Sequence, residues 1–400
     1  MGQAQAVLRV VDDDDDGGDG EGERQSQAVA ATAVPEAEVR LTHEGRERSA
    51  IVVVPQVQQQ EQEQQDQEQQ EQEHLPVVFV FHGGGGNAQQ MRDHCRMDEL
   101  GAREGFITVY PNGAGRFSKK LLTWNCEPGK CGYSADHNVD DVGFVLRLLD
   151  YILKAFPANP HRVYATGLSN GGMFCYRLAS DRLASTRFAA IAPVGGVCLC
   201  SATFQPQRQV PVMHIHSVDD PRALFEGGEG PPFPLTRRTV THSPVMEVVQ
   251  QWTRLNGCDG ANPVTIDTRS SPSPSQQQRR EGRELHTATL LCFPPTAQHR
   301  HAAQQDNQHR PQPTTTTATS TTTTATTTAT AAEVAYARYR NMPVVFLWRL
   351  TGAGHVWPSM AAGERARRAA WVQRFCGSAT DVIDANDEMW RFFQQHQGAG

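Results

Sequence analysis

The sequence lacks the features of membrane proteins, P-loop nucleotide-binding proteins and nucleic-acid-binding proteins. No apolar run in its 400 residues is long enough to cross a bilayer, so we expect no membrane partner. The pattern G-x-x-x-x-G-K-[ST] is absent, and no lysine occurs in the six residues that start at Gly86, the last glycine of the Gly-rich stretch 83–86. The net charge of −7 owes much to Asp12–Asp16, and no basic cluster indicates a nucleic-acid partner.

Secretory and disulfide signals are also weak. The N-terminal stretch Met1–Asp16 has no basic segment followed by an apolar segment, and the chain has no N-x-[ST] sequon. The nine cysteines are an odd number at moderate density. Cys126 and Cys131 are near enough in sequence to form a disulfide, whereas Cys198 and Cys200 are too close to pair easily. No histidine spacing completes a metal site, so we expect no metal, and the redox compartment stays open.

Low-complexity tracts divide the chain. Three of them cannot contribute to a hydrophobic core, namely the Asp/Gly-rich stretch 11–22, the Gln/Glu tract 56–73 and the Thr/Ala tract 311–332. Without these tracts and the other polar segments, roughly 280 residues remain, a normal size for one α/β domain. The sequence therefore predicts a disordered acidic leader at 1–36 and a single domain at 37–396, with insertions at 56–73 and about 268–332.

A nucleophile elbow is indicated where the short apolar strand Val163–Ala165 runs through Gly-Leu-Ser-Asn-Gly into a helical segment. Strand, G-x-S-x-G and helix in this order form a sharp turn that exposes a serine hydroxyl. Side chains at Gly167 and Gly171 would collide with the neighbouring strand and helix. Ser169 is therefore the candidate nucleophile, and a Gly-rich turn with an incidental serine is the alternative.

Strands and helices alternate along the rest of the chain. Apolar runs predict strands at Glu38–Leu41, Ala50–Val54, Leu75–Phe81, Phe106–Tyr110, Phe188–Val194, Val210–His216 and Pro343–Leu350. Helices are predicted at Val139–Ile152, after a Ser243 cap at 245–252, and near Glu364–Phe375 and Asp384–Gln395. For Asp140 and Asp141, in the first turn of their helix, we prefer a structural role to catalysis. The alternation predicts an α/β fold with a doubly wound, mostly parallel sheet and helices on both faces.

Two further groups with catalytic chemistry follow predicted strands. An aspartate at position 219 or 220 follows one strand, and His355 follows the last one. The carboxyl ends of parallel strands are where open α/β sheets bind ligands, and the chain order Ser…Asp…His is that of α/β-hydrolases. His355 would take the proton of Ser169, and the aspartate would orient the imidazole. The alternative for His355 is an ordinary loop histidine.

An oxyanion hole and a substrate pocket complete the predicted site. The backbone N–H of Asn170 would supply one oxyanion donor, and the Gly-rich loop the other, with Gly84 as first choice and Gly85 as second. Trp124 and Trp357 are candidates to line an acyl or aryl pocket. For Trp124 a core position is an equal alternative.

Seven motifs in this order resemble the polyhydroxybutyrate depolymerase/feruloyl esterase family of α/β-hydrolases, which is similar to carbohydrate esterase family 1. They are HGGGGN, TWN…CG, NVDDVGF, RVYATGLSNGGM, FAAIAPV, VPVMHIHSVDD and GAGHVWP. The resemblance covers about Glu38 to His396 apart from the insertions. It implies a serine carboxylic-ester hydrolase without metal or cofactor, acting through an acyl-enzyme on a polyester or on feruloyl or acetyl polysaccharide esters. Asn87, which ends the first motif, joins the substrate-binding candidates.

The family pattern H-G-T-x-D stands here as His-Ser-Val-Asp-Asp at 216–220, which assigns the acid to Asp220 and keeps Asp219 as the alternative. Family members are commonly secreted, so the resemblance implies an extracellular protein, whereas the N-terminus leaves a cytoplasmic one as the alternative. The partner implied is the ester substrate, and the oligomeric state is open. The alternative to an enzyme is a catalytically inactive, hydrolase-like protein that recruits partners through its Gln/Glu and Thr tracts.

Overall fold

The computed structural model describes residues 6–9, 36–55, 74–117, 120–127, 132–233, 237–271, 285–297, 329–359 and 374–398. The chain divides into two compact units. The first comprises Met1–Phe188, Cys200–Gln207 and Gly398–Gly400, and the second comprises Ala189–Leu199 and Arg208–Gln397. The single domain expected over 37–396 stays a prediction.

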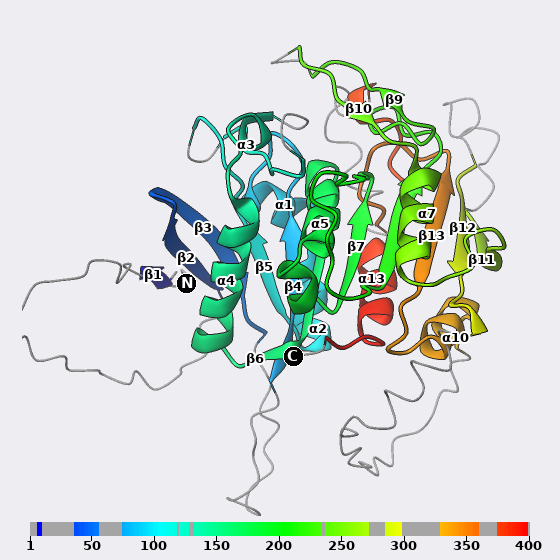
Figure 1. The fold of residues 1–400 in the computed structure, drawn as a ribbon, viewed down its shortest axis with the longest axis horizontal. Helices are drawn as coiled ribbons and strands as arrows, with labels where there is room; N and C mark the ends of the chain where they lie inside the picture. Colours follow the sequence, from blue (N-terminus) through cyan, green and yellow to red (C-terminus); the bar gives the residue numbers. More distant parts are fainter. Residues whose placement is uncertain are drawn as a thin grey trace, which may run out of the picture. The chain divides into compact units, whose positions relative to one another are not determined.

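Six strands of the first unit follow one another in the order β1-β2-β3-β5-β4-β6 (Figure 1). They are β1 Ala6–Arg9, β2 Glu36–His43, β3 Arg46–Val53, β4 Leu75–Phe81, β5 Ile107–Pro111 and β6 Ala158–Leu168. Strand β4 pairs in parallel with both β5 and β6. The antiparallel pairs β2–β3 and β3–β5 lie on one side of these parallel strands.

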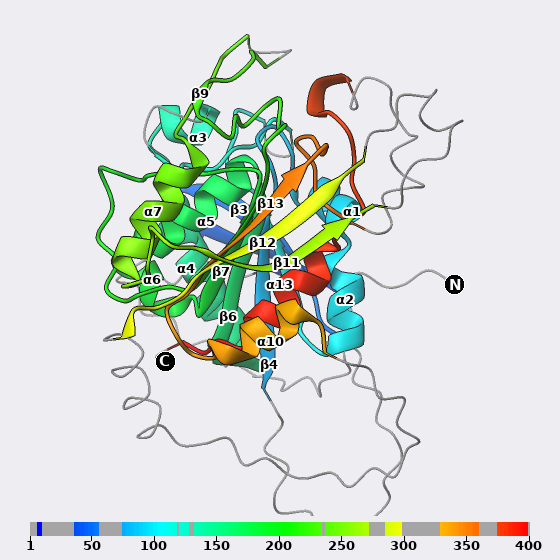
Figure 2. The same cartoon turned by 90° about the vertical axis from the view of Figure 1, so that its right-hand side faces the viewer.

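Helices cover both faces of this first group of strands. Figure 2 shows α1 Ala88–Cys95 and α2 Met97–Glu104 on one face, with α4 Asp141–Ala155 and α5 Asn170–Ser180 on the other. Strand β4 is buried from Pro76 to Phe81, as a continuous apolar run requires when both faces are covered. Two short helices, α3 Gly132–Asp136 and α6 Ala184–Arg187, complete this unit.

The second unit contains a central parallel trio of strands, β7–β8–β13, followed by antiparallel β12 and β11. Their bounds are β7 Ala190–Val194, β8 Val212–Ser217, β11 Val264–Ser270, β12 Thr287–Phe293 and β13 Val345–Thr351. Helix α7 Val245–Leu255 lies on one face of these strands, and α10 Ala331–Arg338 and α13 Ala385–Phe393 lie on the other (Figure 2). A small antiparallel pair, β9 Gly228–Glu229 with β10 Thr241–His242, precedes α7.

Parallel central strands with helices on both faces confirm the α/β class in each unit. The helix predicted over Val139–Ile152 is α4, whose apolar side faces the strands and whose N-cap is Asp140. The closing helix expected near Asp384–Gln395 is α13, with Asp384 as its N-cap. Among the described residues, no helix combines the length and apolar character needed to span a membrane.

Two stretches that we expected to lack structure contain strands, which corrects the sequence analysis. Residues Ala6–Arg9 of the predicted leader form β1 and pair in parallel with β2, from Ala6 beside Ala37 to Arg9 beside Arg40. Strand β12 falls within the predicted insertion 268–332. Its alternate side chains Ala288, Leu290 and Cys292 are fully buried, a period-two pattern that polar flanks of Ser, Gln and His concealed.

Helix boundaries required one further correction. The N-cap of α7 is Pro244, not Ser243, and no side chain caps this helix. The predicted helix near Glu364–Phe375 lies mostly outside the described residues, as do the Gln/Glu tract 56–73 and the stretch 298–328.

Candidate active site

Ser169 stands in strained backbone between β6 and α5. Its φ of 57° and ψ of −118° lie in a region of backbone conformation that residues other than glycine rarely adopt. A Cβ on Gly167 would lie 2.7 Å from the carbonyl oxygen of Phe81, and one on Gly171 would be closer still to that atom. Both glycines are therefore required by the close approach of β4, and the predicted elbow geometry is confirmed.

Helix α5 begins directly after this serine. Ser169 is the N-cap residue, but its side chain makes no capping hydrogen bond, and its carbonyl accepts the N–H of Met173 at 2.8 Å. The side chain is half-buried. The hydroxyl therefore stands at the positive end of a helix, where backbone N–H groups favour a developing negative charge.

The Gly-rich loop after β4 lies beside the elbow within the same unit. A Cβ on Gly84 would stand 3.5 Å from Cβ of Asn170, which places the two predicted oxyanion residues next to each other. The N–H of Gly85 donates to the carbonyl of Leu122 at 2.8 Å, so it is already engaged. Gly84 is exposed, and its N–H makes no hydrogen bond to any residue that the structure describes. The geometry therefore favours Gly84 over Gly85.

The side chain of His82 holds this loop through two hydrogen bonds. Its Nε2 accepts the N–H of Gly113 at 3.0 Å, and its Nδ1 lies 2.9 Å from the carbonyl of Gly83, to which it donates. Burial lowers the pKa of His82 to about 4, so the imidazole is neutral near pH 7. This buried histidine fixes the loop and is not a candidate base.

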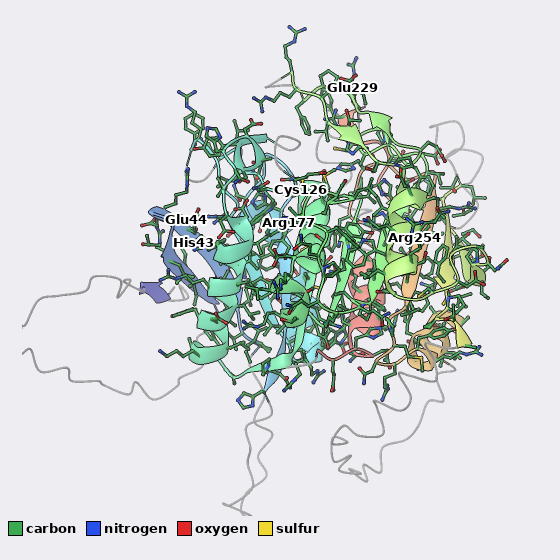
Figure 3. The ribbon with its side chains drawn as sticks, viewed as in Figure 1. His43, Glu44, Cys126, Arg177, Glu229 and Arg254 are labelled. Atoms are coloured by element: carbon green, nitrogen blue, oxygen red, sulfur yellow. The ribbon has the colours of Figure 1, made fainter. Side chains whose placement is uncertain are left out.

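Asn170 is held by the main chain of Trp124. Its Oδ1 accepts the N–H of Trp124 at 2.7 Å, and its Nδ2 donates to the Trp124 carbonyl at 3.1 Å. Nδ2 also lies 3.8 Å from the sulfur of Cys126, which Figure 3 labels beside α5. Cys131, which is near enough in sequence to form a disulfide with Cys126, lies outside the described residues.

Each of the three residues predicted to bind substrate has a structural contact, and their substrate-binding roles stay predictions. Trp124 is fully buried, donates from Nε1 to the carbonyl of His82 at 3.0 Å and stacks on Phe174. Trp357 is also buried and donates to Oδ1 of Asn386 at 2.9 Å. Asn87 is the N-cap of α1, with its Oδ1 accepting the N–H of Gln90. The sequence showed the residue types but not where the side chains point.

In the second unit, His355 and Asp220 form a close pair. The Nδ1 of His355 lies 2.7 Å from Oδ2 of Asp220, and Oδ1 of Asp220 accepts the N–H groups of Arg222 and Ala223 at 2.8 Å each. Burial opposes the charge of Asp220, but His355, His216 and the N–H of Arg222 outweigh it and hold the pKa of the carboxyl below its usual value. An ionised Asp220 keeps the proton on Nδ1 and directs the Nε2 lone pair outward, as a general base requires.

Asp219 has a different contact. It is exposed, and its Oδ2 accepts the N–H of Gly352 at 2.7 Å. The structure thus brings Asp220, and not the alternative Asp219, together with His355.

Two histidines of β8 extend this pair, and sequence reasoning missed their contribution. His216 Nε2 donates to the carbonyl of Ala223 at 2.7 Å and lies 3.5 Å from Oδ2 of Asp220. His214 Nε2 lies 3.0 Å from Nδ1 of His216. Burial lowers the pKa of both imidazoles. The signal in the sequence was His216 at the first position of the H-x-x-x-D pattern, whose side chain supports the acid.

No cluster of three or more His, Cys, Asp and Glu side chains is arranged to hold a metal ion within the described ranges. A serine strained between strand and helix, with a histidine held by a carboxylate farther along the chain, defines an α/β-hydrolase.

The comparison with known proteins shows a similarity to one family. A family model described as "Esterase PHB depolymerase" matches residues 68–251. Over this segment, which is less than half of the chain, the protein is similar to the polyhydroxybutyrate depolymerase/feruloyl esterase family.

Individual relatives match parts of the chain. The bifunctional acetylxylan esterase/xylanase XynS20E of Neocallimastix patriciarum is 32% identical over 144 residues, 36% of this chain and 19% of that protein. Feruloyl esterase B of Piromyces equi is 27% identical over 192 residues, 44% of this chain and 31% of that protein. The chain thus spans less than a third of the length of either relative. Among solved structures, acetyl xylan esterase from Aspergillus awamori is similar with a TM-score of 0.38 and 13% identity, over 60% of this chain and 83% of that one.

Proposed function

We propose that the protein is a serine carboxylic-ester hydrolase that works through an acyl-enzyme. The observation that carries the proposal is the geometry at Ser169, a strained serine at the N-terminus of α5 with Gly84 and Asn170 beside it. Backbone strain of this kind persists where function requires a side chain to project from a fixed turn. The close His355–Asp220 pair supplies the base that such a serine needs.

The proposed reaction has two halves. His355 takes the proton of Ser169 as its oxygen attacks the ester carbonyl, and the imidazolium then protonates the leaving alcohol. The N–H groups of Asn170 and Gly84 stabilise the tetrahedral oxyanion. Water, deprotonated by the same histidine, next attacks the acyl carbonyl; the bond to Ser169 Oγ breaks, the imidazolium returns its proton to that oxygen, and the acid is released. Asp220 remains ionised throughout and stabilises the imidazolium.

We propose a polyester or an acylated plant polysaccharide as the substrate. Relatives whose names specify acetylxylan and feruloyl esters support the polysaccharide, and the family model supports the polyester. All three ester types require the same nucleophile, base and oxyanion donors, so the acyl pocket decides among them.

The test is a substrate panel of p-nitrophenyl acetate and butyrate, methyl ferulate, acetylated xylan and poly(3-hydroxybutyrate). Wild-type protein should hydrolyse the activated esters and at least one of the natural esters, and Ser169→Ala should hydrolyse none. Ser180→Ala is the matched control, because Ser180 ends the same helix and its hydroxyl only donates to the carbonyl of Arg177. Equal rates for wild type and Ser169→Ala would refute the proposal.

A further inference from the structure

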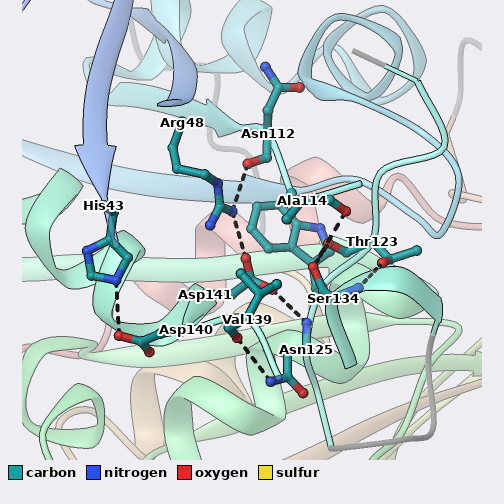
Figure 4. A network of polar contacts seen from close by, with 12 residues as sticks. His43, Arg48, Asn112, Ala114, Thr123, Asn125, Ser134, Val139, Asp140 and Asp141 are labelled. Atoms are coloured by element: carbon teal, nitrogen blue, oxygen red, sulfur yellow. Dashed lines mark hydrogen bonds and ion pairs between the residues drawn. The ribbon is translucent and has the colours of Figure 1, made fainter. Parts of the chain in front are cut away.

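We propose that the buried ion pair of Arg48 and Asp141 is a positioning element for the oxyanion donor at Asn170. The inference rests on the proposed function and concerns the first unit alone. Figure 4 shows the polar network that carries it, which joins β3, the start of α4 and the loop through Asn125.

The pair itself is withdrawn from water. Arg48 Nη2 lies 2.6 Å from Oδ1 of Asp141, and the two side chains are 3% and 0% exposed. The same nitrogen donates to the carbonyl of Asn112 at 3.1 Å, and the guanidinium lies 4.0 Å from the centre of the Phe144 ring. Removing two charges from water costs several kcal/mol per ion, and an apolar pair of similar volume is often as stable. Stability alone therefore gives little reason for an ion pair at this place.

Asp141 reaches beyond its ion pair to a loop. Its Oδ2 accepts the backbone N–H of Asn125 at 2.8 Å. Asn125 belongs to neither β3 nor α4 but to the loop between β5 and α3. The side-chain amide of Asn125 donates to the carbonyl of Val139 at 3.0 Å, so the loop is tied to the start of α4 at two points. On the other side, Ser134 donates to the carbonyl of Thr123 at 2.8 Å. The residue between these anchors is Trp124.

Trp124 connects the loop to the elbow. Its N–H and carbonyl hold the two ends of the Asn170 amide, at 2.7 and 3.1 Å, and Asn170 is the first residue of α5. Its indole donates to the carbonyl of His82, immediately before the Gly-rich loop. A shift of the loop at Asn125 would thus displace both sides of the proposed oxyanion hole. Displacements of about 1 Å can lower a rate by about 10²-fold.

Asp140 offers a matched control. This neighbouring carboxylate also lies at the start of α4, where it accepts the N–H of Gly143 at 2.9 Å and contacts Nε2 of His43 at 3.0 Å. Neither contact leads to Trp124. Asparagine caps helices about as well as aspartate, so Asp140→Asn should leave turnover unchanged.

The experiment compares kcat and KM on p-nitrophenyl butyrate for wild type, Asp140→Asn and Asp141→Asn. In Asp141→Asn an amide replaces one of the two acceptors, so we expect kcat to fall about 10- to 100-fold with KM little changed. Affinity for a trifluoromethyl ketone, whose hemiketal places an oxyanion in the hole, should fall in parallel. Asn170→Ala removes the amide that links Trp124 to α5. The double variant Asp141→Asn/Asn170→Ala should therefore be no slower than Asn170→Ala alone.

A second variant separates positioning from folding. Arg48→Met/Asp141→Leu removes both charges together, so no unpaired charge stays buried, and the N–H of Asn125 loses its acceptor. We expect it to fold and to show the same loss of kcat. The inference is overturned if this double variant folds and keeps the wild-type kcat, and equally if it unfolds. In either case the Arg48–Asp141 ion pair would only hold β3 against α4.

Failure of this inference is distinct from failure of the proposed function. If wild type hydrolyses esters and Ser169→Ala does not, while Asp141→Asn matches wild type, only the positioning role is wrong. If Ser169→Ala retains activity, the proposed function is wrong.

Discussion

Asp220 and Asp219 are neighbours in the chain, but they face different partners. The carboxylate of Asp220 contacts His355 at 2.7 Å, and that of Asp219 accepts the N–H of Gly352. Asp220→Asn should lower kcat by roughly 10⁴-fold, because an amide no longer holds the catalytic tautomer. Asp219→Asn should be mild. Steady-state kinetics on an activated ester measure both, and the reverse ranking would transfer the acid role to Asp219.

His216 supports the acid without touching the base. Its neutral imidazole donates to the carbonyl of Ala223, one residue beyond the Arg222 N–H that Asp220 accepts. Residues 222 and 223 of the acid loop are therefore held in two ways, by the carboxylate of Asp220 and by the buried side chain of His216. This arrangement explains why the residue before the loop is a histidine and not an aliphatic residue.

Buried histidines make the fold sensitive to acid, and His396 is the clearest case. Burial, followed by the charge of Arg208, lowers the pKa of His396 to about 3, compared with 6.5 in an unfolded chain. Between these values the unfolded state binds the proton and the folded state does not, so stability falls as pH decreases from 6.5 toward 3. At pH 4.5 the loss from this residue is about 2–3 kcal/mol.

The corresponding prediction concerns the difference in unfolding free energy between pH 7 and pH 4.5, measured with urea. His396→Leu should reduce that difference by about 2–3 kcal/mol. The same change at the exposed His74 serves as the control and should leave it as in wild type. An unchanged pH dependence in His396→Leu would show that His396 accepts a proton as readily in the folded state.

At the scale of elements, α10 shows where the second insertion ends. Its N-cap Thr330 accepts the N–H of Glu333, and the Glu333 side chain accepts the N–H of Thr330, a complete capping box. Ala332, which we assigned to the insertion, is fully buried. The helix therefore begins within the predicted tract, and the removable part stops before Thr330.

This boundary gives a paired prediction. Replacing 311–328 by a short Gly/Ser loop should leave kcat and thermal stability unchanged, because loop length alters closure entropy by only about 0.6 kcal/mol per doubling. Extending the deletion to 332 removes the cap and should cost about 1 kcal/mol or more. Thermal melts and kcat/KM on a short and a bulky ester check both. A large loss of activity from the shorter deletion would show that the tract takes part in catalysis.

For the whole molecule, local patterns predicted the elbow and the central strands. Strand, G-x-S-x-G and helix are contiguous, so Ser169 and its glycines could be found from a few residues, and β4 was given by one apolar run. Strand β12 was not predicted, because its alternation of buried and less buried side chains is short and the residues on either side are polar.

Contacts between distant residues could not be predicted. Arg48 and Asp141 are 93 residues apart, and Trp124 and Asn170 are 46 apart. Their meeting depends on strand order and register, which no local pattern encodes. The burial of Trp124 and Trp357 follows from the same packing, and their assignment to a substrate pocket stays a prediction.

The most direct test of the central claim, that Ser169 is a nucleophile activated by His355, is covalent labelling of the native protein with a fluorophosphonate probe. Mass spectrometry of the digested protein identifies the labelled peptide, and the labelling rate is measured by quenching at intervals. We predict a label on Ser169 that is absent in Ser169→Ala, at least about 10³-fold slower in His355→Ala and unchanged in Ser180→Ala. Labelling at another residue, or equal labelling of Ser169 in wild type and His355→Ala, would contradict the account.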